Sequence, residues 1–343
     1  MTKYVCTLFD SNYIHLGLAL YDSLIAHFQD FHLWILAMDE KCQGKLESLA
    51  LKNVTVLGLK DIEAKDVLEA KSNRTWQEYC WTLSPVLPSY ILGKNPQIDH
   101  IAYLDSDICF YSSPQPIYDE IGNRSIMIIP HRFPERLRHL EVNGVFNVQM
   151  MFFRRDKKGL ECLKRWRSQC LAWCYYRLED GKMGDQKYLD EWPSRYGKDL
   201  CVLECVQAGV ALWNAESYEI QQRGSAIFIN GKPLIFYHFH QFKYFSGGYY
   251  VDGIRNYAID RAAILPVYLF YIRAILAAKS RYKFQVPKVK FARLSELADK
   301  KLLEANTVWA FVVGRSMIFL VKAFRQVGLW ELLKKIGKKL KKK

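Results

Sequence analysis

Asp105 and Asp107 are the residues whose types and spacing most clearly suggest chemistry in this sequence. They flank Ser106 directly after the hydrophobic run 98–104, which predicts a buried strand. Carboxylates on one turn offer oxygen ligands to a hard divalent cation such as Mn²⁺ or Mg²⁺, whose remaining coordination sites can take diphosphate oxygens. Such a cation neutralises charge on a leaving diphosphate. The turn is therefore a candidate metal centre.

The segments around this turn alternate between predicted strands and helices. We expect strands at 4–9, 31–38, 54–57, 98–104, 125–129, 146–153 and 233–238, and helices at 14–25, 41–51, 76–92 and 158–178. This alternation predicts an α/β domain with a mostly parallel central sheet covered on both faces, whose ligands gather at the carboxyl ends of the strands.

Other motifs follow one another in a characteristic order over about the first 245 residues. They are Phe9-Asp10-Ser11-Asn12-Tyr13, Ala19-Leu20-Tyr21-Asp22-Ser23-Leu24, the turn 105–107, Val145-Phe146-Asn147-Val148, Gly184-Asp185-Gln186-Lys187-Tyr188-Leu189 and Tyr237-His238-Phe239-His240-Gln241-Phe242-Lys243. In this order they resemble the retaining glycosyltransferases of family 8 and their GT-A relatives. The resemblance implies a single GT-A (Rossmann-like) catalytic domain, which we expect to span residues 1–255.

The resemblance also implies a role for each matching residue. Asp10 and Asn12 would hold the uridine of a UDP-sugar. The metal ligands for Mn²⁺ or Mg²⁺ would be Asp105, Asp107 and His238, and the nucleotide diphosphate would contact Asp105, Ser106 and Lys243. The candidate catalytic residues are Asn147, which would face the donor sugar and the acceptor, and Asp185 and Gln186, which would contact the transferred sugar. His240 is an alternative metal ligand to His238. If the reaction inverts the anomeric carbon, Asp185 is the candidate general base.

The sequence departs from the family pattern at three places. Val148-Gln149 replaces the usual Ala-Gly, and Thr82-Leu83-Ser84-Pro85 stands where the family has a basic residue. The interval from His238 to Lys243 is one residue shorter than in the family. The departures leave the fold and the metal site in place and leave the donor sugar open.

Single residues also admit ordinary structural interpretations. Asp10 and Asn12 are common turn residues, and Asp185 could cap a helix that begins near Gln186. Histidines on aromatic strands, such as His238, are often satisfied core residues. Further residues could meet the acceptor, and these are the cluster His131-Arg132-Phe133-Pro134-Glu135-Arg136, the pair Trp213-Asn214, and Glu216.

The positive charge of the chain lies in its C-terminal part. Residues 279–343 contain 18 basic and 4 acidic residues, which account for the whole net charge of +14. A nucleic-acid groove needs cations spread over the folded body, so we expect no nucleic-acid partner. We expect residues 256–343 to form a helical, basic, amphipathic extension, with an interfacial helix at 308–325 and a lysine cluster at 334–343 that binds an anionic membrane.

The predicted location is the cytoplasmic face of a membrane. The first residues lead directly into a strand instead of a signal peptide, and the nine cysteines form no metal or disulfide pattern. Reduced thiols in the cytoplasm are the expectation.

We therefore predict a peripheral, metal-dependent hexosyltransferase that uses a UDP-sugar, acts on a lipid-linked or surface polysaccharide precursor and retains the anomeric configuration. An aspartate-dependent phosphatase would need Thr or Val where Cys109 stands, and a sugar nucleotidyltransferase would need a Gly-rich N-terminal loop. The remaining alternative is a non-catalytic peripheral membrane scaffold that retains a sugar-nucleotide-binding fold.

Overall fold

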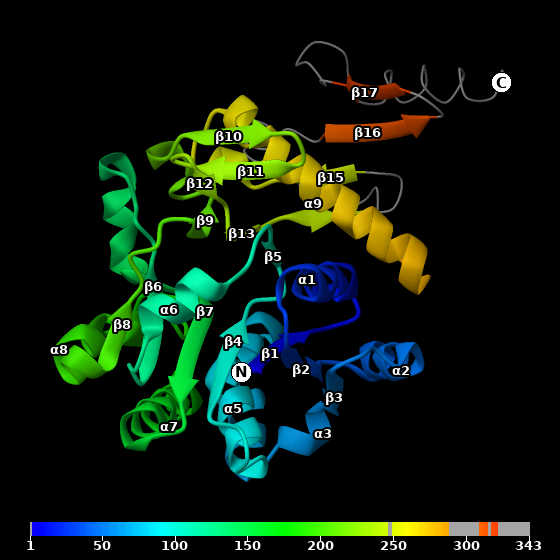
Figure 1. Cartoon of the computed structure of the whole chain (residues 1–343). Helices are drawn as coiled ribbons and strands as arrows, with labels where there is room; N and C mark the ends of the chain where they lie inside the picture. Colours follow the sequence, from blue (N-terminus) through cyan, green and yellow to red (C-terminus); the bar gives the residue numbers. More distant parts are fainter. Residues whose placement is uncertain (1, 246–248, 288–308, 315–316, 322–343) are drawn as a thin grey trace. The chain divides into compact units, whose positions relative to one another are not determined.

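The computed structural model of the chain describes residues 2–245, 249–287, 309–314 and 317–321 (Figure 1). The contacts between residues divide the chain into two compact units. The first contains residues 1–239 and 259–284, and the second contains residues 240–258 and 285–343.

The first unit carries the predicted alternation of strands and helices. Its elements up to the turn at 105–107 are β1 (Lys3–Phe9), α1 (Ile14–His27), β2 (Phe31–Ala37), α2 (Glu40–Leu49), β3 (Val54–Gly58), α3 (Leu59–Ile62), α4 (Lys65–Lys71), α5 (Trp76–Lys94) and β4 (His100–Leu104). After the turn follow β5 (Ile108–Phe110), α6 (Gln115–Ile121), β6 (Ile126–Pro130), η1 (Glu135–Asn143), β7 (Phe146–Arg154), α7 (Lys157–Ala172), η2 (Lys187–Glu191), α8 (Trp192–Tyr196), η3 (Gly197–Asp199) and β8 (Leu200–Val202). The unit is completed by β9 (Ala208–Ala211), η4 (Ala215–Ser217), β10 (Ile220–Arg223), β11 (Ala226–Ile229), β12 (Lys232–Pro233), β13 (Phe236–His238) and α9 (Arg261–Tyr282).

A seven-stranded sheet in the order β3-β2-β1-β4-β7-β6-β8 forms the centre of this unit. The pairs β1–β2, β1–β4, β2–β3 and β6–β8 are parallel, whereas β7 is antiparallel to both β4 and β6. The prediction of a mostly parallel central sheet is therefore confirmed. Near-continuous apolar runs explain the arrangement, because strands with helices on both sides bury both of their faces.

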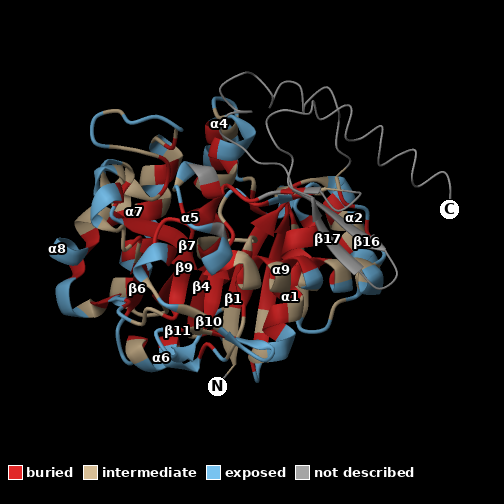
Figure 2. Cartoon of the chain, turned by 90° about the horizontal axis from the view of Figure 1, so that it is seen from above, coloured by how far each residue is buried: buried red, intermediate tan, exposed pale blue. Residues whose placement is uncertain are grey.

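Two hydrophobic layers enclose the sheet, so neighbouring residues of one strand enter different cores. Val5 belongs to the layer that contains residues of α1, α2, α6 and α9, whereas Cys6 belongs to the layer that contains residues of α3, α4, α5, α7 and α8. Figure 2 shows the consequence: the central strands are buried, and exposed residues lie on the outer surfaces of the helices.

Two small sheets, β5-β13-β9 and β10-β11-β12, complete the first unit. The first of them bears on the site, because β5 directly follows the turn 105–107. The predicted helix at 158–178 is shorter than expected, since α7 ends at Ala172 and an antiparallel bridge joins Glu179 to Lys182. The chain leaves the helix at Trp173, whose backbone is extended, and the turn Asp180-Gly181, with φ of 50° and 70°, closes the bridge.

Helix α9 packs against α1 in the first unit. The hydroxyl of Tyr111 donates to the carbonyl of Val267 at 2.8 Å, and the Phe239 and Tyr271 rings stack with centroids 3.7 Å apart. Within the described residues, Ala262–Tyr282 is the one helix long and apolar enough to cross a membrane, and 39% of its most apolar 18-residue stretch is buried. The structure thus groups α9 with the sheet, whereas the sequence analysis placed it in the extension. As a functional boundary, residue 255 stays a prediction.

The second unit contains a four-stranded sheet in the order β14-β15-β16-β17. Its elements are β14 (Lys243–Tyr244), β15 (Tyr249–Val251), η5 (Ile254–Asn256), β16 (Trp309–Gly314) and β17 (Met317–Val321). The predicted interfacial helix at 308–325 is therefore wrong for the described strands, which form an antiparallel hairpin. Their aromatic and β-branched residues favour strands. The lysine cluster 334–343 lies outside the described residues.

Candidate active site

The turn 105–107 lies where β4 ends in the large sheet. The Asp105 amide donates to the carbonyl of Gln149 at 2.9 Å, which ties the turn to β7. The chain then enters β5, which runs antiparallel to β13 with Ile108 opposite His238. This register brings His238 to the two aspartates from a distant part of the sequence.

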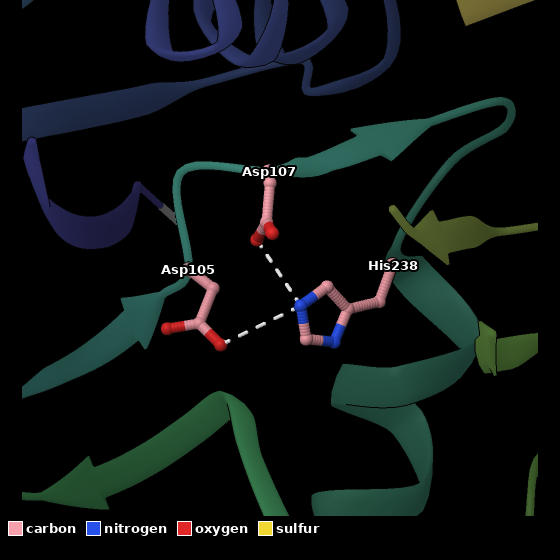
Figure 3. A group of neighbouring side chains, drawn as sticks. All are labelled: Asp105, Asp107 and His238. Carbon is pink, nitrogen blue, oxygen red and sulfur yellow. Dashed lines mark ion pairs between the residues drawn. The ribbon is translucent and has the colours of Figure 1, made fainter. Parts of the chain in front are cut away.

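Asp105, Asp107 and His238 form a compact group in which the imidazole faces both carboxylates (Figure 3). His238 Nε2 lies 3.1 Å from Asp107 Oδ1 and 3.8 Å from Asp105 Oδ2. The His238 side chain is 4% exposed, whereas the side chains of Asp105 and Asp107 are 29% and 18% exposed. One side of the group is therefore closed by protein, and the carboxylates keep access to solvent.

The electrostatics of this group reflect burial and close charges. The pKa of Asp105 is raised to about 6, because burial and the charge of the nearby Asp107 outweigh the opposing effect of His238. Burial lowers the pKa of His238, but Asp107 and Asp105 outweigh that effect, so the pKa lies above its ordinary value. The two carboxylates thus favour the protonated form of the imidazole.

The donor set fits a divalent cation. One ligand atom from each of the three residues lies within 4.8 Å of the others. Two carboxylate oxygens suit Mg²⁺ and Mn²⁺, and an imidazole nitrogen is compatible with Mn²⁺. A bound cation would replace the imidazole proton as the partner of the carboxylates. The group could therefore hold a metal ion.

Asp185 lies next to this group. It is 6% exposed and interacts with Asp105 and with the side chain of Ser84 from α5. Burial, reinforced by the charge of Asp105, raises the pKa of Asp185 to about 7, although the hydrogen bond with Ser84 opposes the rise. The Trp166 indole donates to the Asp185 carbonyl at 2.9 Å and fixes the backbone there.

The amide side chains of Asn147 and Gln186 meet beside Asp185. Asn147 Nδ2 donates to Gln186 Oε1 at 3.4 Å and lies 3.1 Å from His131 Nε2. Gln186 Nε2 donates to the carbonyl of Asn143 at 3.0 Å. The structure thus brings the three predicted sugar-facing residues into one neighbourhood.

Asp10 and Asn12 form the turn between β1 and α1. Asp10 Oδ1 accepts the amides of Asn12 and Tyr13 at 2.9 and 3.1 Å, as an ordinary turn residue does. Its other oxygen accepts the Trp76 indole at 3.3 Å and the Asn12 amide side chain at 3.1 Å. The pKa of Tyr13 is raised to about 12, by burial and by the charges of Asp107 and Asp10. The charge of Asp107 in the metal group therefore acts on the Tyr13 phenol.

For three predicted site residues, Ser106, Lys243 and His240, the structure adds only their exposure or a neighbouring ring. Ser106 is partly exposed in the turn. Lys243 is exposed on β14, and His240 lies near the Tyr257 ring with centroids 6.3 Å apart. Lys243 and His240 belong to the second unit, so their roles stay predictions.

The additional acceptor candidates have structural contacts. The Asn214 side chain is fully buried and bonds the carbonyls of His131 and Gly209. The Arg132 guanidinium donates to the carbonyls of residues 203, 205 and 208. Arg136 forms an ion pair with Glu216. These contacts account for all three side chains without a ligand.

The sequence analysis missed several residues beside the site. Tyr13 and Ser84 were within quoted motifs, but only the structure shows that Ser84 forms a hydrogen bond with Asp185 and that the charge of Asp107 acts on Tyr13. Gln149 was noted as a departure, and its side-chain amide is fully buried with no hydrogen-bond partner among the described residues. Helical spacing from Ser84 could have identified Trp81, one turn earlier on α5.

The chain is similar in sequence to two known proteins and similar in fold to solved structures. No family model matches the chain. It is 32% identical to the uncharacterized protein YfnD of Bacillus subtilis (strain 168) over 280 residues, which are 79% of this chain and 88% of YfnD. It is 30% identical to YfnF of the same organism over 254 residues, which are 72% of this chain and 84% of YfnF.

Among solved structures, the chain resembles the galactosyltransferase LgtC in complex with donor and acceptor sugar analogs. The match has a TM-score of 0.51 at 13% sequence identity and covers 84% of this chain and 99% of LgtC. At this identity the likeness concerns the fold, and it confirms the GT-A fold predicted from the motifs. The chain therefore belongs to one family with YfnD and YfnF, and its fold is that of the GT-A glycosyltransferases.

Proposed function

We propose that the protein transfers a hexose from a UDP-sugar to a hydroxyl group of a glycan or lipid-linked saccharide, with retention at the anomeric carbon. The observation that carries this proposal is the group of Asp105, Asp107 and His238 at the carboxyl end of β4 in a glycosyltransferase fold. The order of the motifs along the chain supports a UDP-sugar as the donor and a reaction that retains the anomeric configuration.

Asp105, Asp107 and His238 would hold the cation, Mn²⁺ or Mg²⁺. When bound, such a cation supplies positive charge opposite the leaving diphosphate. The imidazole must be neutral to serve as a ligand, so metal binding would compete with the protonation of His238 that the carboxylates favour. Lys243 is proposed to add a second positive charge at the diphosphate.

Asp185, Asn147 and Gln186 would orient the transferred sugar. With a pKa of about 7, the Asp185 carboxyl is protonated in part of the metal-free molecules at neutral pH and can then donate a hydrogen bond. The amides of Asn147 and Gln186 provide both donors and acceptors, which suit sugar hydroxyls. For an inverting reaction, the same pKa would suit Asp185 as general base.

The uridine would lie against the turn after β1. Asp10 and Asn12 provide polar atoms there, while Tyr13 and Trp76 are 39% and 45% exposed. Exposed aromatic rings offer stacking surfaces to a nucleobase. The contact between Asp10 and the Trp76 indole keeps one of these rings beside the polar turn.

The proposed location is the cytoplasmic face of a membrane. The basic C-terminal region supports this proposal through its charge, because anionic lipid attracts lysine clusters. A lipid-linked acceptor would then be presented to an enzyme held at the same surface.

A donor-hydrolysis screen tests the function. Purified protein is incubated with UDP-glucose, UDP-galactose, UDP-N-acetylglucosamine and GDP- or dTDP-hexoses, with Mn²⁺ or with EDTA. We expect Mn²⁺-dependent release of UDP from at least one UDP-sugar and none from the Asp107→Asn variant. Absence of turnover with every donor, together with metal-independent nucleotide binding, would favour the non-catalytic scaffold.

A further inference from the structure

An aromatic pair lies beside the proposed catalytic residues. The rings of Trp81 and Tyr176 meet edge to face, with centroids 5.4 Å apart and an interplanar angle of 72°. Trp81 is half-buried, whereas Tyr176 is 65% exposed. The pair therefore runs from the interior of the first unit to its surface.

The inner end of this pair adjoins the segment that carries Asp185. Gly184 has a φ of +54°, and a Cβ placed on it would lie 3.3 Å from Cε3 of Trp81. The glycine thus lets the indole approach the backbone one residue before Asp185. Ser84, the hydrogen-bond partner of Asp185, lies three residues after Trp81 on α5 and so projects from the same side of the helix.

The outer end is held by a structured loop. The Tyr176 amide donates to Glu78 Oε1 at 2.7 Å, and the other oxygen of Glu78 accepts the Thr75 amide at 2.8 Å. Glu78 is buried, so these bonds are protected from water. The loop backbone at Tyr176 is therefore fixed to the first turn of α5.

The neighbouring residue Tyr175 contacts other parts of the protein instead of Trp81. The Tyr175 ring lies between the guanidinium groups of Arg74 and Arg177, at 3.9 and 4.3 Å from its centroid, and its hydroxyl contacts Asn73. The Tyr175 carbonyl accepts the amide of Gly184 at 3.0 Å. Tyr175 thus braces the loop and leaves Tyr176 to face Trp81 and solvent.

We propose that Trp81 and Tyr176 form a pyranose-binding subsite for the acceptor saccharide, an inference that rests on the proposed glycosyl transfer. The C–H faces of a pyranose pack against aromatic rings, and their burial removes apolar surface from water. In the proposed transfer, the donor hexose lies at the metal group and Asp185. A sugar ring that contacts the exposed Tyr176 therefore belongs to the other substrate, the acceptor.

Matched variants of the exposed residues test this subsite. Tyr176→Ala removes one ring, Tyr176→Phe keeps it, and Leu178→Ala alters another exposed side chain of the same loop, since Leu178 is 51% exposed. The donor is the UDP-sugar found in the hydrolysis screen, and the acceptors are methyl β-galactoside, methyl α-glucoside and methyl β-N-acetylglucosaminide.

We expect Tyr176→Ala to raise the acceptor KM about five- to tenfold, the scale of one aromatic contact, and to change donor hydrolysis less than about twofold. Tyr176→Phe and Leu178→Ala should keep the wild-type KM. An unchanged KM in Tyr176→Ala would overturn the subsite. A selective loss of UDP-sugar affinity relative to UDP would also overturn it, because the ring would then belong to the donor.

Saturation-transfer NMR with the same methyl glycosides keeps this test separate from the proposed function. If no nucleotide sugar is hydrolysed, the transferase proposal fails while saccharide binding can still be measured. The subsite predicts saturation of the pyranose ring protons by the wild type and its loss in Tyr176→Ala. No saturation of any glycoside by the wild type would contradict the subsite directly.

Discussion

His238 Nε2 lies 3.1 Å from Asp107 Oδ1 because β13 pairs with β5 in a register that sets His238 opposite Ile108. The proposed metal centre thus depends on two sequence-distant strands in a small sheet beside the large one. Changes in the carboxylates, in the imidazole and in this strand pairing should therefore alter transfer activity, Mn²⁺ affinity and stability, respectively.

Asp105→Asn and Asp107→Asn should each abolish most transfer activity, because each removes one anionic ligand and keeps the size of the side chain. A loss on the order of a hundredfold is the scale expected for such a charge contact. Asp119→Asn, at an exposed site on α6, is the matched control. Initial rates at saturating donor and circular dichroism spectra would check the prediction, and full activity in both site variants would refute the metal-site assignment.

His238→Ala should weaken Mn²⁺ binding more than His240→Ala. His238 lies within the group of ligand atoms, whereas His240 contacts Tyr257 in the second unit. Titration of activity with Mn²⁺ gives the apparent metal affinity of each variant. An unaffected His238→Ala variant with a weakened His240→Ala variant would transfer the role to His240.

Asp185→Asn should stabilise the metal-free protein at alkaline pH. Burial raises the pKa of Asp185 from 3.8 to about 7. Between these values the folded state binds the proton and the unfolded state does not, so this residue's contribution to stability falls as pH rises and is least favourable above pH 7. The gain in Tm of the variant should therefore be larger at pH 8 than at pH 5.5, measured in EDTA. Equal gains at both values would contradict the raised pKa.

Gly209→Ala should destabilise the fold around β9, which pairs with the strand that carries His238. Gly209 has a φ of +80°, and an added Cβ would lie 2.8 Å from Ile129 Cγ2 and 2.9 Å from Gln149 Nε2. A loss of at least roughly 1–2 kcal/mol is expected from the strained backbone alone. Gly44→Ala is the control, because nothing lies within 4 Å of its added Cβ and a helical alanine adds stability. Urea unfolding of both variants would show opposite signs, and equal midpoints would be inconsistent with this geometry.

Removal of residues 322–343 should release the protein from anionic vesicles. This truncation keeps β16, which pairs with β15, and β17, which pairs with β16, whereas the removal of all residues after 304 would delete both strands. It removes nine basic residues and one acid, and basic residues near an anionic membrane contribute about 1 kcal/mol each. Flotation with anionic and neutral liposomes would measure the effect. Equal flotation of full-length and truncated protein would exclude the lysine tail as the anchor.

Local patterns predicted six of the seven strands of the large sheet, because those strands are apolar runs with clear ends, and missed the edge strand β8, which has only three residues. The position of Asp105 and Asp107 followed directly from the strand before them. The partnership with His238 came from a resemblance of motifs, since no local pattern encodes the register between β5 and β13. The contacts of Tyr13 and Ser84 depend on the packing of α1 and α5 and were beyond local analysis. The hairpin of β16 and β17 was wrongly predicted as a helix, because basic residues at helical spacing suggested an amphipathic helix although the apolar residues between them favour strands.

Calorimetric titration of the full chain with UDP, with and without Mn²⁺, tests the central claim most directly. The account predicts that UDP binds tightly only with Mn²⁺, and that Asp107→Asn loses the metal-dependent part while Asp119→Asn keeps it. Equal UDP affinity with Mn²⁺ and with EDTA in the wild type, or no binding under either condition, would contradict a metal-dependent transferase built on Asp105, Asp107 and His238.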